Sequence, residues 1–98
     1  MAKYILLWEL NRDKMPDDPK ARGEGWLAFL DIIKQDLKAG IHKDWGCFVG
    51  ETRGYTISEG DEVELTKRMQ GFLPFITFEV HPVMSVDQIA EVAKSLTG

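Results

Sequence analysis

Short stretches rich in β-branched, aromatic and long apolar residues, with side chains alternating between two faces, predict β-strands. Four stretches have this pattern, at residues 3–10, 41–50, 54–58 and 75–83. In the first, both faces are apolar apart from Glu9, so we expect a central strand that is covered on both sides. Gly50 and Gly54 bracket a short polar segment, which makes the second and third strands a hairpin.

Elsewhere apolar residues recur every three or four positions, the period of an α-helix with one buried face. We expect helices over residues 18–39 and 59–72 and a short one from residue 85. Asp18 and Pro19 form an N-terminal signal, Gly40 ends the first helix, and Ser85 begins a capping box. The expected core between helices and sheet consists of Trp26, Leu30, Ile33, Leu65, Met69, Phe78 and Val80.

The elements follow in the order β-α-β-β-α-β with an extra C-terminal helix, which is an α+β fold of the split β-α-β type in one domain, residues 1–98. Right-handed crossovers place both long helices on one face of the sheet. The other face would expose apolar residues of the first strand and Phe75, a large patch for a monomer. The terminal helix is too short to cover it, so we expect a homodimer packed sheet to sheet, with a monomer as the alternative.

Charge and cysteine usage narrow the class of protein. The 98 residues carry a net charge of -4 with scattered Lys and Arg, which disfavours a nucleic-acid partner. No apolar stretch is long enough to span a membrane or to resemble a secretory signal. With Cys47 as the only cysteine, we expect a cytoplasmic protein, no disulfide, and a buried, inert thiol.

The element order and the run "FITFEVHPVMSVDQIAEV", especially "FEVHPVMS", resemble a family of small bacterial and archaeal dimeric α+β-barrel proteins of unknown function. The resemblance implies a ferredoxin-like chain that forms a barrel as a dimer. Its wider superfamily includes muconolactone isomerases, small quinone-forming monooxygenases and haem-dependent peroxidases, so the fold alone assigns no activity. No residue set of those enzymes transfers to this chain, and we expect no cofactor.

The most interesting candidate site lies on the last strand, where Glu79 and His81 are two residues apart and therefore share a face. We interpret them as candidate catalytic acid-base groups, as proton abstraction beside a carbonyl requires. The candidate ligand-binding residues around them are Thr77, Phe75, Glu9 and Trp8. In the alternative reading His81 only ends the strand, and Glu79 pairs across the dimer or points into solvent.

A second, weaker cluster is His42 with Asp44 and Trp45. Spacing predicts that His42 and Asp44 share a face, but two ligands without a third are weak evidence for a metal, so no metal site is assigned. Charges that protect an edge strand are the simpler explanation. The tryptophans, too, are more simply explained as core.

Two classes of function remain. The first is a non-catalytic dimeric domain that binds a small ligand or a protein. The second is a cofactor-free enzyme of isomerase or monooxygenase type that uses Glu79 and His81. The enzyme class requires those two side chains to converge on a closed apolar pocket, whereas the binding class does not.

Overall fold

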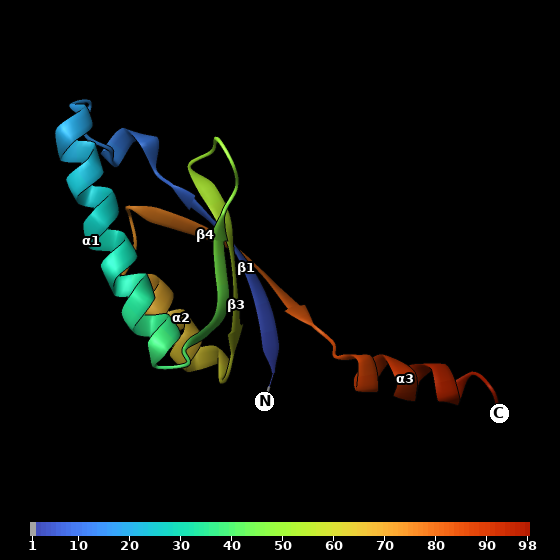
Figure 1. Cartoon of the computed structure of the whole chain (residues 1–98). Helices are drawn as coiled ribbons and strands as arrows, with labels where there is room; N and C mark the ends of the chain where they lie inside the picture. Colours follow the sequence, from blue (N-terminus) through green and yellow to red (C-terminus); the bar gives the residue numbers. More distant parts are fainter. Residues whose placement is uncertain (1) are drawn as a thin grey trace.

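The computed structural model describes residues 2–98 and contains a four-stranded antiparallel sheet and three α-helices (Figure 1). The elements are β1 (Lys3–Leu10), a 3-10 turn η1 (Arg12–Lys14), α1 (Pro19–Lys38), β2 (His42–Cys47), β3 (Arg53–Glu59), α2 (Glu62–Gln70), β4 (Ile76–Val83) and α3 (Val86–Ser95). The predicted α+β class is therefore confirmed, with a ferredoxin-like order of elements and an extra C-terminal helix.

The sheet has the strand order β2-β3-β1-β4, so β1 is central as predicted. Its residues pair with β3 on one side and β4 on the other; Leu7 lies opposite Tyr55 and Glu79. β4 is an edge strand, which explains how it accommodates Pro82, a residue without a backbone N–H. Both α1 and α2 cover the same face of the sheet (Figure 1).

The helices begin and end close to the positions that their capping residues predict. The Asp18 carboxylate accepts a hydrogen bond from the Ala21 N–H at 3.1 Å, and Gly40 follows α1 with φ 79°. At α3 the capping box of Ser85 and Gln88 is complete. None of the helices within residues 2–98 combines the length and the apolar composition needed to cross a membrane.

An aromatic cluster fills the space between α1 and the sheet. Trp8 stacks on Trp45 with ring centroids 5.1 Å apart, and Phe29 contacts both rings edge-on. The buried apolar residues are Tyr4, Leu6, Trp8, Ile33 and Ile76. These residues place the core on the helix side of β1.

The predicted core is confirmed only in part. Ile33 is buried, whereas five other expected members are half-buried: Trp26, Leu30, Leu65, Met69 and Phe78. Val80 is exposed, so its assignment to the core is wrong. Its half of β4 runs along the sheet edge beyond the two covering helices, as Figure 1 shows.

The C-terminal helix lies apart from the rest of the chain. β4 leads α3 away from the sheet and helices (Figure 1), and no other element of residues 2–98 packs against it. The chain is consequently elongated, with extents of 62 × 26 × 21 Å and a radius of gyration of 16.5 Å. A compact chain of this length would have a radius of gyration of about 13 Å.

Candidate functional site

The sheet face opposite the helices carries most of the site predicted on β4. Thr77 lies opposite Glu9, and Glu79 lies opposite Leu7, so alternation places these side chains on one face together with His81. Nε2 of His81 lies 3.3 Å from Oε2 of Glu79. The two side chains are 54% and 67% exposed, so in the single chain they do not converge on a closed pocket.

The structure separates Trp8 and Phe75 from this group. Trp8 points to the helix side of β1, is 2% exposed, and donates its indole N–H to the Tyr55 carbonyl at 3.2 Å. Phe75 precedes β4 and belongs to the turn after α2, where its N–H donates a hydrogen bond to the Phe72 carbonyl. The candidate residues therefore belong to three different places, and only the group with Glu79 and His81 remains together.

The prediction that His42 and Asp44 share a face is wrong. β2 has a bulge at Lys43, so that His42 lies opposite Ser58 while Asp44 lies opposite the next residue, Ile57. The bulge adds one residue between them and reverses the alternation. Asp44 consequently points to the uncovered face, where it accepts a hydrogen bond from the hydroxyl of Tyr55 at 2.7 Å.

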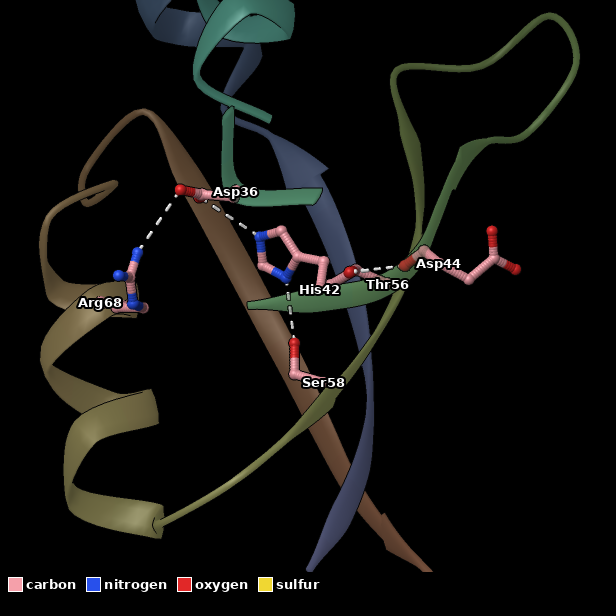
Figure 2. Close-up of polar contacts among 6 residues, drawn as sticks. All are labelled: Asp36, His42, Asp44, Thr56, Ser58 and Arg68. Atoms are coloured by element: carbon pink, nitrogen blue, oxygen red, sulfur yellow. Dashed lines mark hydrogen bonds and ion pairs between the residues drawn. The ribbon is translucent and has the colours of Figure 1, made fainter. Parts of the chain in front are cut away.

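His42 instead joins a buried polar cluster on the helix side, shown in Figure 2. Its Nδ1 lies 3.0 Å from the Ser58 hydroxyl, and its Nε2 lies 3.5 Å from Oδ2 of Asp36. The other oxygen of Asp36 lies 3.6 Å from Nη1 of Arg68. Nearby, Thr56 donates its hydroxyl proton to the Asp44 carbonyl at 2.8 Å.

The cluster resembles a Ser-His-Asp triad in its order of contacts, yet it lacks access for a substrate. Ser58 is 1% exposed, and the cavity that His42 lines holds about 20 Å³, enough for a single water. Burial lowers the pKa of His42; the Asp36 charge opposes this and Arg68 reinforces it. A neutral ring satisfies both neighbours if it donates to Asp36 and accepts from Ser58. The cluster thus ties α1, β2, β3 and α2 together.

An apolar hollow of ligand size lies elsewhere, between the first half of α1, the turn η1 and the segment that joins α2 to β4. It has a volume of about 310 Å³, and its lining is mainly apolar. The apolar and aromatic lining residues are Leu10, Met15, Pro16, Trp26, Phe29, Ile32, Phe72, Phe75 and Ile76. Phe75 and Ile32 are 59% and 47% exposed, so large apolar side chains here have no protein partner. We refer to this hollow as the α1 pocket.

Two charged residues line the α1 pocket, and both are cationic. Lys14 comes from η1, and Arg22 comes from the first turns of α1. Arg22 donates from Nη1 to the carbonyl of Asp17 at 3.1 Å, which holds its guanidinium beside the loop. Among residues 2–98 neither side chain forms an ion pair with a carboxylate. The pocket therefore combines an apolar wall with uncompensated positive charge.

Cys47 is exposed, so the expectation of a buried thiol is wrong. Its Sγ lies 3.4 Å from the Glu51 carbonyl, and the partial burial of the thiol followed by the Glu51 charge raises its pKa. A raised pKa keeps the sulfur protonated and weakly nucleophilic.

Within residues 2–98 no group of three His, Cys, Asp or Glu side chains is arranged to hold a metal ion.

Sequence reasoning missed both the buried cluster and the α1 pocket. Asp36 left a detectable signal, since it follows Ile33 by three residues and so falls on the apolar stripe of α1, where a carboxylate requires a partner. The α1 pocket left none, because its walls combine residues 10–32 with residues 71–76, which meet only in the folded chain.

Comparison with known proteins gives a family without an assigned activity. The model of a family described as a domain of unknown function, DUF3303, matches residues 3–97. No curated protein matches the sequence significantly. Because the match extends over nearly the whole chain, the protein belongs to the DUF3303 family.

Proposed function

We propose that this chain is a small-ligand-binding domain and that the ligand occupies the α1 pocket. The observation that carries the proposal is the exposure of Phe75 and Ile32 beside a hollow of about 310 Å³. That volume is at the lower end of the range for ligand sites. A small apolar ligand would remove these side chains from water and stabilise the folded chain.

The charges of the pocket favour a ligand with an anionic group. Lys14 and Arg22 are the charged lining residues, and a carboxylate or sulfonate would receive hydrogen bonds from both. A guanidinium already oriented by the Asp17 carbonyl loses less side-chain freedom on binding. The preferred ligand is therefore a small aromatic or alicyclic acid.

The test compares 1-naphthoate with its neutral analogue 1-naphthalenemethanol, using amide chemical-shift mapping and titration. We expect both to perturb residues of the α1 pocket and the acid to bind more tightly. Arg22→Gln should reduce this preference, because it removes the charge and leaves the apolar wall. Lys20→Gln is the matched control, since Lys20 is exposed on the same helix and does not line the pocket. Shifts confined to other surfaces would refute the proposal.

A second candidate is a cofactor-free isomerase or monooxygenase with Glu79 and His81 as acid-base groups. It is supported by their 3.3 Å contact and by an adjoining hollow of about 290 Å³ that Leu7, Phe48, Arg53 and Glu79 line. Catalysis there requires enclosure by another molecule, since both side chains are more than half exposed. In a thermal-shift screen of small acids, a ligand whose effect disappears in Glu79→Gln and His81→Asn would favour this candidate.

We also propose that the protein works in the cytoplasm. The support is that the sequence has one cysteine, Cys47, and that its thiol is free. Localisation of a fluorescent fusion of the full chain tests this.

A further inference from the structure

The α1 pocket and the small cavity that His42 lines, which we call the inner cavity, share a wall. Three residues line both spaces: Phe29, Phe72 and Ile76. The rings of Phe29 and Phe72 meet edge to face, with centroids 6.2 Å apart and planes at 86°. Because a residue that lines both spaces lies between them, these two rings form a partition that closes the inner end of the α1 pocket.

One face of α1 runs past both spaces. Arg22, Trp26, Phe29 and Ile33 follow one another at intervals of four, three and four residues, so they lie on the same side of the helix. Arg22 and Trp26 line the α1 pocket, Ile33 lines the inner cavity, and Phe29 lines both. At 1.5 Å per residue, Phe29 lies about 10 Å and Ile33 about 16 Å along the helix from Arg22. The partition is therefore about 10 Å from the charged end of the α1 pocket.

The two rings of the partition are supported differently. Phe29 lies within the 20-residue helix α1, whereas Phe72 lies in the turn of residues 71–75 between α2 and β4. The backbone of this turn is held by the Phe72 carbonyl, which accepts hydrogen bonds from the N–H groups of Phe75 and Ile76 at 2.9 and 3.1 Å. A change of the Phe72 side chain leaves these bonds in place. Phe72 is thus the residue at which the partition can be opened.

The polar side chains that line the inner cavity already have partners in the chain. Both ring nitrogens of His42 are engaged, by Ser58 and by Asp36. The Thr56 hydroxyl donates to the Asp44 carbonyl at 2.8 Å. A polar group of a ligand would be buried here without a hydrogen-bond partner, which is unfavourable. The end of a ligand that approaches the partition is consequently apolar.

We propose that Phe72 determines the length of the ligand in the α1 pocket, and that the ligand is an arylalkanoic acid about 10 Å long. This inference rests on the proposed function of the pocket. The carboxylate of such an acid pairs with Lys14 and Arg22, and its ring abuts Phe29 and Phe72. An extended 4-phenylbutanoate spans this distance. Each methylene group that leaves water for an apolar space strengthens binding about fourfold, which corresponds to about 0.8 kcal/mol, but the closed partition leaves no such space for a longer chain.

Isothermal titration of the full chain with phenylacetate, 4-phenylbutanoate and 6-phenylhexanoate tests the proposal. We expect the wild type to bind 4-phenylbutanoate most tightly. In Phe72→Ala the two spaces join, so 6-phenylhexanoate should become the tightest ligand, by about fourfold or more. Phe72→Leu opens the partition less, retains an apolar side chain, and should shift the preference in the same direction.

Leu73→Ala is the matched control, because Leu73 is the neighbour of Phe72, is 41% exposed and lines neither space. It should keep the wild-type order of affinities. Near-UV circular dichroism of the Trp8–Trp45 stack verifies that each variant is folded.

Intermolecular nuclear Overhauser effects locate the far end of the bound acid. In Phe72→Ala we expect contacts between the ring of 6-phenylhexanoate and the Ile33 methyl groups, which line the inner cavity. The wild type should lack these contacts. The same order of affinities in the wild type and both Phe72 variants, or tightest binding of 6-phenylhexanoate by the wild type, would overturn the role of Phe72 and leave the proposed function standing. If none of the three acids perturbs the α1 pocket of the wild type, the proposed function fails together with this inference.

Discussion

Two histidine-carboxylate pairs lie on opposite faces of the same sheet. His42 and Asp36 are 3.5 Å apart, with side chains 10% and 13% exposed. His81 and Glu79 are 3.3 Å apart and more than half exposed. In sequence, the exposed pair is the more conspicuous, because its members are two residues apart on one strand. The buried pair joins the end of α1 to β2 and has no spacing that identifies it in advance.

The difference between the pairs is one of environment. His42 contacts the Ser58 hydroxyl and the Asp36 carboxylate, and burial lowers its pKa. Around His81 water competes for the same contact, so the pair contributes little to stability and its groups stay free to act on a partner or ligand. A short distance between charged atoms therefore says little about their role until the exposure of both is known.

The largest expected effect follows from removing the buried histidine. His42→Ala leaves Ser58 and Asp36 without their shared partner, and each buried polar group left unpaired costs about 1 to 3 kcal/mol. Because Asp36 retains Arg68, we expect the free energy of unfolding to fall by about 3 kcal/mol in urea titrations followed by tryptophan fluorescence. His81→Ala is the control. Equal losses in the two variants would eliminate the distinction between the pairs.

The pH dependence of stability sharpens the same distinction. An unfolded chain protonates His42 around pH 6.5, while burial holds its folded pKa lower. The unfolded state then binds more protons, so the unfolding free energy is complete above about pH 6.5 and decreases as the pH falls below it, by at most about 1.4 kcal/mol per unit. His42→Asn should lack this part of the slope, and His81→Asn should retain it. A slope that survives in His42→Asn would assign the effect to other groups.

The outer partner of the buried cluster should matter less. Arg68 is 48% exposed and lies 3.6 Å from Asp36, so Arg68→Gln should cost about 0.5 to 1 kcal/mol. Lys67→Gln removes a fully surface pair with Glu64 from the same helix and serves as the matched control. Differential scanning calorimetry of both variants makes the comparison. A loss of several kcal/mol in Arg68→Gln would show that the buried carboxylate depends on this cation.

The smallest effect is expected at the exposed pair. Glu79→Gln and His81→Asn should each change the unfolding free energy by less than about 0.5 kcal/mol, since solvent replaces the lost contact. Chemical denaturation at two chain concentrations separates this effect from any change in association. A loss above 1 kcal/mol in either variant would mean that the pair supports the fold.

Much of the fold could be predicted from the sequence because its strands and helices follow regular periods and the helices have recognisable caps. Regular alternation placed Thr77, Glu79 and His81 on one face correctly, and capping residues marked the ends of α1 and the start of α3. The bulge at Lys43 could not be predicted, since it has no compositional mark. Nor could the position of α3, because a capping box specifies that a helix starts and says nothing about which surface it meets.

The candidate sites were less predictable for a related reason. The residues on β4 belong to one regular strand, so the two-residue period of a strand was enough to predict that they share a face. The α1 pocket requires Lys14, Arg22 and Phe75 to meet through two loops and a helix. Tertiary contacts of this kind are not encoded in any local period, and so the α1 pocket was found only in the structure.

The bulge at Lys43 also determines where this hairpin tolerates a change in chain length. The bulge is the one extra residue between the His42–Ser58 and Asp44–Ile57 pairs. Deleting Lys43 would make the ladder regular and leave every side chain of β2 on its present face. Deleting Gly46 instead would turn the β2 residues on one side of the deletion to the opposite face of the sheet. Part of the aromatic cluster would then be exposed. Within this one strand we therefore expect the deletion of a single residue to be tolerated at Lys43 and disruptive at Gly46.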